Sequence, residues 1–302
     1  MKYLPAPTHK PLRVYSDGAG TQSVAVMVLQ SMGLLHYDAY VFANVGEKSE
    51  NPDTIAYRNE VMLPFAEKHE INVIERRRIY KGEPIDLYDF TLAPGTTIPI
   101  PVKFSEGGML NRKCTSDWKV EVVNKWIKQE AKAPRVILGI GFSSDERGRI
   151  YKKYKPWHDR NYSWEKKKNQ TGQWKPGAKL GFWRQYEFPL AAMGINRAAG
   201  IALVQNAGLP APPASKCWFC PFTSRQEWIE RKMTDAPAFA QAEAFEEALN
   251  AKYKQMKTAI GGSLSVSLHR DGIALKNVPA QLSLFDTFED AIEPCDVGYC
   301  GL

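Results

Sequence analysis

The first 150 residues alternate short apolar runs, typical of β-strands, with segments whose apolar residues recur at helical spacing. Strand-like runs lie at 12–16, 37–46, 71–77 and 134–142, and helix-like segments lie at 23–33, 51–70 and 114–131. This alternation indicates right-handed βαβ units, because parallel strands need a crossover connection and a helix is the usual one. We therefore expect an α/β fold with a mostly parallel sheet and helices on both faces.

The first strand-like run leads into the sequence SDGAGTQS at residues 16–23, directly before the first helix-like segment. A strand, a glycine-containing turn and a helix N-terminus can together present backbone N–H groups to a phosphate. Gly18 and Gly20 allow positive φ and a close backbone approach, and the polar side chains that follow add hydrogen bonds. The loop lacks the GK[ST] of a Walker A motif and the third glycine of GxGxxG. The spacing alone leaves two alternatives, a phosphate site or a simple connection.

Residues 151–184 break the alternation and are rich in cations and aromatic rings. The segment contains ten Lys and Arg residues and two acidic residues, so its net charge is +8, while the net charge of the whole chain is +7. Cations neutralise phosphates and exposed rings stack on unpaired bases, so we expect an insertion that contacts nucleic acid. The alternative is that the rings pack on the main domain while the lysines stay in water. The residues expected to contact nucleic acid are Lys152, Lys153, Trp157, Trp164, Lys166, Lys167, Lys168 and Trp174.

The helical pattern returns at 196–208 and 225–257, and the chain is irregular from about 260. We predict a nucleotide-binding core at 1–150, the basic aromatic insertion at 151–184, a helical part of the same domain with a CxxC at 185–260, and an irregular tail at 261–302. No stretch approaches the 18 uninterrupted apolar residues of a membrane span, and the N-terminus lacks the apolar segment of a secretory signal. We expect a cytoplasmic protein with no membrane partner.

The chain has five cysteines, an odd and small number for a secreted disulfide framework. Cys217 and Cys220 form a CxxC, a spacing that can chelate a metal, form a redox pair or simply pack. Cys114 lies close to cationic neighbours in sequence, which should favour its thiolate. Cys295 and Cys300 can return to complete a site. Iron–sulfur or sulfur-transfer chemistry, zinc binding and inert thiols all remain open at this point.

Five motifs in the same order resemble the PP-loop ATP pyrophosphatase superfamily, and most of all its phosphoadenosine phosphosulfate (PAPS) reductase-like branch. GAGTQS before VAVMVL resembles the SGGxDS loop of that superfamily. VFANVGEKSENPDT, CTSDWKVEVVNKWI, GIGFSSDERGR and YEFPLAAMGINRAAGIALVQNAGLPAPPASKCWFCPF are similar to its later segments, so the resemblance covers about 12–230. Phage and bacterial members share CWFCPF and a C-terminal CDxGxC. The resemblance implies an adenine-nucleotide α-hydrolase-like fold.

The resemblance also implies a site for ATP and Mg²⁺. Its expected residues are Ser16, Gly18, Ala19, Gly20, Thr21, Gln22, Ser23, Asn44, Gly46, Glu146 and Arg147. The loop departs from the family pattern at two positions, since Gly18 replaces a serine and Gln22 replaces an aspartate. Ser16 can supply the missing hydroxyl. The missing carboxylate removes the group that usually assists magnesium.

In function, the resemblance implies an ATP pyrophosphatase that adenylates a substrate and supports sulfur transfer onto nucleic acid, as in tRNA thiolation or DNA phosphorothioation. Ser23, Cys114 and Lys119 are the expected catalytic residues. Cys114, Cys217 and Cys220, with Cys295 or Cys300, are expected to hold a [4Fe-4S] cluster or alternatively Zn²⁺. The implied partners are nucleic acid and a cysteine desulfurase. Two alternatives are a sulfonucleotide reductase that releases sulfite from PAPS or APS, and a catalytically inactive nucleic-acid-binding subunit, which Gln22 favours.

Overall fold

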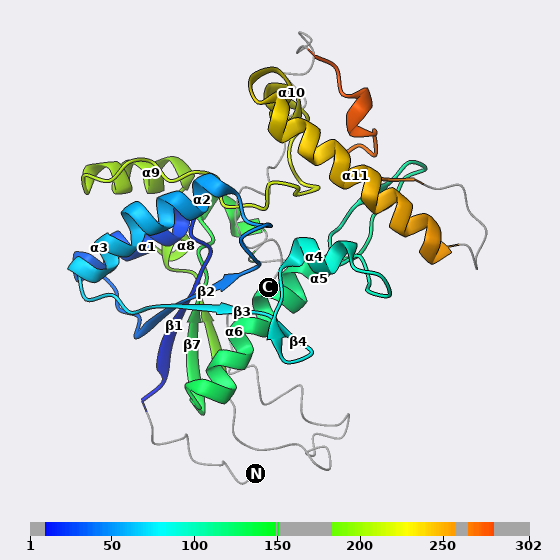
Figure 1. The fold of residues 1–302 in the computed structure, drawn as a ribbon. Coiled ribbons are helices and arrows are strands. Elements are labelled where there is room, and N and C mark those ends of the chain that lie inside the picture. The colour runs from blue at the N-terminus through cyan, green and yellow to red at the C-terminus, as the bar shows by residue number, and fades with distance from the viewer. Residues whose placement is uncertain (1–9, 149, 151–182, 258–264, 281–302) are drawn as a thin grey trace. The chain divides into compact units, whose positions relative to one another are not determined.

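A computed structural model describes residues 10–148, 150, 183–257 and 265–280 of the chain (Figure 1). Contacts within the chain divide it into two compact units, each assembled from separate segments. Unit 1 comprises Met1–Ala43, Ile55–Arg76 and Val122–Pro213, and unit 2 comprises Asn44–Thr54, Arg77–Glu121 and Ala214–Leu302. The boundaries that the sequence suggested at 150, 184 and 260 stay predictions.

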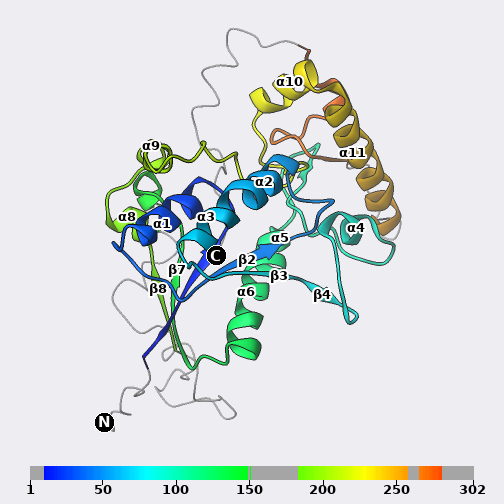
Figure 2. The same cartoon turned by 60° about the vertical axis from the view of Figure 1, so that its left-hand side comes forward.

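Unit 1 is built around a five-stranded parallel sheet with the strand order β3-β2-β1-β7-β8 (Figure 2). The strands are β1 (Leu12–Asp17), β2 (Ala39–Asn44), β3 (Val73–Arg77), β7 (Arg135–Gly139) and β8 (Trp183–Glu187). Val14 of β1 lies opposite Ala39 of β2 and Leu138 of β7. The predicted α/β class is confirmed.

Alternate residues of the strands enter two different cores, as the pleat of a strand requires. Tyr15, Tyr40 and Phe42 pack with α1 (Thr21–Ser31), α3 (Leu63–Lys68) and α9 (Arg197–Asn206). Val14 and Val41 point to the opposite face, where they pack with the helical segment around Ile127. Helices therefore cover both faces of the sheet, and the central strands β2 and β7 are mostly apolar in sequence.

The predicted helices are present with small changes in their bounds. The segment expected at 51–70 forms α2 (Pro52–Tyr57), a π-helical turn η1 (Arg58–Met62) and α3. The segment expected at 114–131 forms α5 (Lys113–Thr115), η2 (Ser116–Val120), α6 (Glu121–Lys125) and η3 (Trp126–Glu130). Shorter elements near the sheet are the 3₁₀ turn η4 (Ser144–Glu146) and α8 (Pro189–Ala192).

Strand β8 begins at Trp183, within the last two residues of the segment 151–184 that the sequence assigned to the insertion. Residues 183–187 form the fifth strand and pair in parallel with β7, with Arg135 opposite Trp183. Pairing with a neighbouring strand decided this segment, because its polar composition carries no strand pattern of its own. The part of the insertion at 151–182 lies outside the described residues.

Unit 2 has one apolar core, which includes Phe90, Trp118, Phe219, Trp228 and Phe245. Besides α5 and η2, its elements are the hairpin β4 (Ile79–Tyr80) and β5 (Glu83–Pro84), α4 (Leu87–Leu92), β6 (Lys103–Phe104), α10 (Arg225–Thr234), α11 (Ala236–Lys257), β9 (Val266–Ser267) and the 3₁₀ turn η7 (Leu275–Asn277). The helical spacing at 225–257 is therefore confirmed as two helices.

Residues 265–280 belong to the segment that the sequence assigned to an irregular tail at 261–302, and they contain the short strand β9 and the turn η7. β9 pairs antiparallel with β6, and the buried Glu246 of α11 accepts hydrogen bonds from the backbone N–H groups of Leu268 and Leu275, both at 2.7 Å. A buried carboxylate on a neighbouring helix thus satisfies donors that a loop cannot satisfy by itself. In the described part of the chain, no helix has the length and apolar content to span a membrane.

Candidate functional site

The glycine loop connects β1 to α1 in unit 1, and the structure brings its predicted residues together in one buried turn. Ala19 adopts a left-handed conformation with φ +52°. The backbone N–H of Gly18 donates to Ser23 Oγ at 2.9 Å, and that of Ala19 donates to Asp17 Oδ1 at 2.7 Å. Two amide groups of the loop are therefore used inside the protein. No side chain caps the first turn of α1, which begins at Thr21.

The turn that follows the neighbouring strand β7 lies against this loop. A Cβ added at Gly141 would lie 2.3 Å from Tyr15 Oη and 2.9 Å from Gln22 Cβ, so only glycine fits there. Glu146 caps its own turn by accepting hydrogen bonds from the N–H and Oγ of Ser143. The exposed Arg147 donates to the carbonyl of Ala191 at 3.1 Å. Ligand contacts of Glu146 and Arg147 stay predictions.

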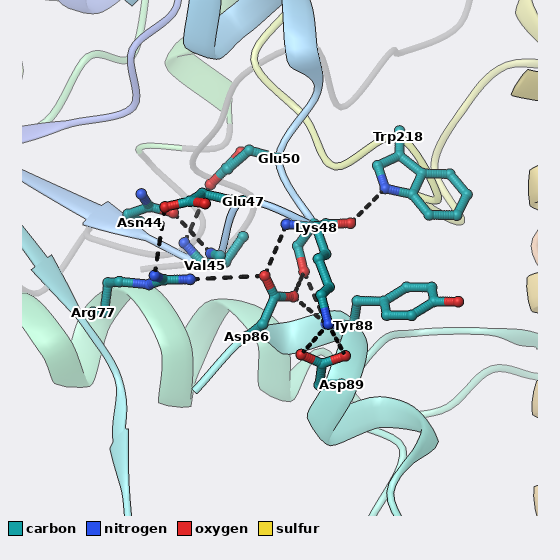
Figure 3. A network of polar contacts seen from close by, with 12 residues as sticks. Asn44, Val45, Glu47, Lys48, Glu50, Arg77, Asp86, Tyr88, Asp89 and Trp218 are labelled. Carbon is teal, nitrogen blue, oxygen red and sulfur yellow. Dashed lines mark hydrogen bonds and ion pairs between the residues drawn. The ribbon is translucent and has the colours of Figure 1, made fainter. Parts of the chain in front are cut away.

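Asn44 and Gly46 belong to unit 2, in a loop that a polar network holds in place (Figure 3). The N–H of Gly46 donates to Asn44 Oδ1 at 2.7 Å. Gly46 has φ +123°, and a Cβ there would lie 2.1 Å from Asp86 Oδ2. Asp86 also accepts hydrogen bonds from the N–H groups of Lys48 and Tyr88. Packing against Asp86 therefore explains this glycine without a ligand.

The same loop holds the CxxC segment by backbone pairing. Glu50 and Cys217 form an antiparallel bridge. The N–H of Asn51 donates to the carbonyl of Lys216 at 3.2 Å, and the N–H of Trp218 donates to that of Ser49 at 3.3 Å. The indole N–H of Trp218 adds a bond to the carbonyl of Lys48 at 2.7 Å (Figure 3). The position of the CxxC is therefore set by residues that follow β2 in the chain.

Three cysteines line one pocket in unit 2. Cys114 comes from α5, and Cys217 and Cys220 come from the CxxC turn. Lys119 lies beside them, and the rest of the lining includes Val45, Leu87, Ile100, Arg112, Lys216, Phe219 and Phe222. The cavity has a volume of about 60 Å³, enough for a few water molecules or a group of similar size. The structure thus joins residues that the sequence separates widely.

Burial dominates the electrostatics of these thiols. It raises the pKa of Cys114 to about 11, although Lys119 and Arg112 act in the opposite direction. Burial likewise raises the pKa of Cys217 and of Cys220. The nearby cations act on Cys114 in the expected direction, but desolvation of the charged form outweighs them, so the net shift of its pKa is upward.

Lys119 keeps its charge in this pocket. Burial lowers its pKa, but the Glu50 carboxylate and the three sulfurs raise it, and the net shift is upward. Glu50 is 1% exposed and accepts from the N–H of Val45. No sequence pattern predicted Glu50, Arg112 or Lys216 as pocket residues. Glu50 follows β2, and no spacing connects it to a cysteine. The sequence shows only that Lys216 directly precedes the CxxC.

The thiols fit an iron–sulfur cluster or zinc in kind but not in spacing. Cysteine thiolates are the preferred ligands of both groups. Among the described side chains, however, no three His, Cys, Asp or Glu residues are gathered closely enough to hold a metal ion. Cys295 and Cys300 lie outside the described residues, as does the basic aromatic insertion up to 182. The metal set stays a prediction, and the sulfur chemistry proposed below needs no metal.

Comparison with solved structures finds weak similarity. Among solved structures, the chain is similar to a tRNA thiolase. This is the U34-tRNA thiolase NcsA from Methanococcus maripaludis with its [4Fe-4S] cluster, aligned over 80% of this chain and 72% of that chain, at 12% identity and a TM-score of 0.40. So low a score assigns no role to any residue here. No protein-family model matches the chain, and no curated protein matches it.

Proposed function

We propose that this protein is an ATP-dependent enzyme that adenylates nucleic acid and then transfers sulfur to the activated atom. The observation that carries the proposal is the pocket that gathers Cys114, Cys217 and Cys220 around the charged Lys119. Thiols that merely fill a core have no need of a cation beside them, since removing that charge from water costs free energy. The arrangement suits a sulfur species that carries negative charge.

The strand order of unit 1 supports the nucleotide part of the proposal. β2 and β3 lie on one side of β1, and β7 and β8 lie on the other, so the order of the strands reverses between β1 and β7. In open α/β sheets, ligands bind outside the carboxyl ends of the strands at such a switch point. The glycine loop and the N-terminus of α1 follow β1 at this place.

In the first step, a nucleic-acid oxygen attacks the α-phosphate of ATP, and pyrophosphate leaves with the electron pair. Mg²⁺, when bound with the nucleotide, neutralises charge on the phosphates. Such an ion is usually held by one or two carboxylates and the phosphates themselves. Asp17 and Glu146 are the carboxylates that end or follow the two strands at the switch point. Backbone donors at the N-terminus of α1 stabilise the negative charge of the phosphates.

In the second step, a persulfide on one pocket cysteine supplies the sulfur. Its terminal sulfur attacks the substrate atom that bears the adenylated oxygen, AMP leaves with that oxygen and the electron pair, and a disulfide links the substrate to the cysteine. A second pocket thiol then attacks the cysteine sulfur of this bond, which releases the thiolated product and forms a Cys–Cys disulfide. A persulfide donor, such as a cysteine desulfurase, and a dithiol reductant restore the starting state.

Nucleic acid is the proposed substrate because of the basic aromatic insertion at 151–184. Neutralising Lys166, Lys167 and Lys168 together should lower the slope of log affinity against log salt by about two to three, as the loss of three phosphate contacts predicts. Nucleic-acid binding titrated at several salt concentrations measures this slope. An unchanged slope would mean that the insertion packs on the protein instead.

The deciding experiment measures pyrophosphate release from ATP by the full chain, with tRNA, with DNA and with neither. In parallel, transfer of labelled sulfur from a persulfide donor to each nucleic acid is followed. Nucleic-acid-stimulated pyrophosphate release with labelled product supports the proposal. Release of sulfite from PAPS with a dithiol, and no pyrophosphate, would instead identify a sulfonucleotide reductase. Binding of nucleic acid with neither reaction would identify an inactive subunit.

A further inference from the structure

Gln22 lies in the first turn of α1, and the nitrogen of its side-chain amide is buried. Its side chain is 7% exposed. Its Nε2 atom has no hydrogen-bond acceptor among the residues that the structure describes. A buried donor left unsatisfied costs about 1–3 kcal/mol, so native proteins seldom keep one without a reason. This donor needs an acceptor from outside the described chain.

Gln22 lies at the switch point of the sheet, where the neighbouring strands β1 and β7 end. Its Cβ lies against Gly141, in the turn that leaves β7, while its own helix follows β1. Gly141 has no side chain, and any Cβ there would collide with Tyr15 and press on Gln22. The backbone of the β7 turn can therefore approach the N-terminus of α1 closely. A ligand at this place meets both strand ends.

The other donors nearby favour an anion. α1 has eleven residues, and no side chain caps its first turn, so the partial positive charge of the helix N-terminus is not offset there. The N–H groups of Gly18 and Ala19, by contrast, already donate to Ser23 and Asp17. The amide of Gln22 therefore adds a side-chain donor where the loop has turned two backbone donors inward.

We propose that Gln22 donates a hydrogen bond directly to a phosphoryl oxygen of a nucleoside polyphosphate bound at the N-terminus of α1. This inference rests on the proposed function for the identity of the nucleotide. A carboxylate at this position would repel the phosphates unless a metal ion lay between them. A neutral amide needs no intervening ion. The loop therefore binds the polyphosphate with a weaker requirement for Mg²⁺ at this contact than an acidic residue would impose.

The test is isothermal titration of ATP into the full chain, once with Mg²⁺ and once with EDTA. Gln22→Leu should weaken binding roughly tenfold or more in both conditions, as loss of a hydrogen bond to a charged acceptor predicts. Gln22→Glu should lose most metal-free binding and recover part of it with Mg²⁺. Gln205→Glu, on an exposed position of α9, makes the same charge change in unit 1 and should bind as the wild type does.

Two results overturn the inference and differ in what else they affect. If the wild type binds ATP and Gln22→Leu binds it equally well, the inference fails and the proposed function stands. If the wild type binds no adenine nucleotide, both fail together. Should the Gln22 variants not fold, the wild type with nitrogen-labelled glutamine gives the answer. One side-chain amide signal must then shift on addition of ATP, and an unmoved spectrum overturns the inference.

Discussion

In unit 1, residues 16–23 form one continuous turn between a strand and a helix, whereas in unit 2 the pocket takes its thiols from two distant segments. The turn places its residues through local backbone geometry, and its inner hydrogen bonds run between neighbours such as Gly18 and Ser23. The pocket depends on long-range pairing between residues 49–51 and 216–218. A local site tolerates changes elsewhere, while an assembled site depends on the scaffold that joins its parts.

The substitution Cys217→Ser should have the largest effect, and it should affect the pocket of unit 2 without affecting the turn of unit 1. Sulfur transfer should fall about a thousandfold or more, because the variant lacks a thiol that carries or resolves the persulfide and Ser cannot replace it. Pyrophosphate release should stay near the wild-type rate, since the turn in unit 1 is unchanged. Both rates are measured on the same preparation. Ser215→Ala, also in the pocket lining, is the matched control. Equal loss of both reactions would contradict this separation.

The second largest expected effect is on the rate at which Cys114 is alkylated near neutral pH. Its pKa of about 11 means that its thiolate fraction near neutral pH is several hundred times smaller than that of an ordinary cysteine with a pKa of about 8.5. Alkylation by iodoacetamide, followed by mass spectrometry of the Cys114 peptide, should therefore rise with pH until about pH 11 in the metal-free protein. Half-maximal alkylation near pH 8.5 would show that the cations prevail over burial.

Gly141→Val tests how closely the two strand ends approach each other. The new side chain would collide with Tyr15 and Gln22, and such overpacking typically costs about 1–3 kcal/mol of folding free energy. Urea unfolding measures the loss, and ATP binding should fall with it. Gly148→Ala is the control, because a Cβ there meets nothing within 4 Å. Equal midpoints for the two variants would refute the close approach at Gly141.

Ser23→Ala should have the smallest effect on stability. It removes the acceptor for the N–H of Gly18, and one lost hydrogen bond of this kind costs about 1 kcal/mol. ATP turnover should also decrease, because the loop loses one of its inner contacts while the helix remains. Thermal unfolding and pyrophosphate release measure the two effects. Turnover equal to that of the wild type would remove Ser23 from the catalytic residues.

The order of strands and helices in unit 1 could be predicted because each element carries its own periodic pattern. The strands at Leu12–Asp17 and Arg135–Gly139 and the helix at Thr21–Ser31 each have enough buried apolar residues to be recognised alone. β8 and residues 265–280 could not be predicted in this way. The structure of β8 depends on pairing with β7. The structure of residues 265–280 depends on pairing with β6 and on the carboxylate of Glu246.

The sequence by itself determined the glycine turn and the residue types of the cysteine set, because neighbours in the chain and the chemistry of thiols suffice for both. Only the tertiary structure decided that Cys114 lies in one pocket with the CxxC and that Glu50 lies beside Lys119. It also decided that the amide nitrogen of Gln22 is buried with no acceptor among the described residues. The physical reason is that desolvation and long-range contact depend on which surfaces meet in the folded chain. No local pattern records them.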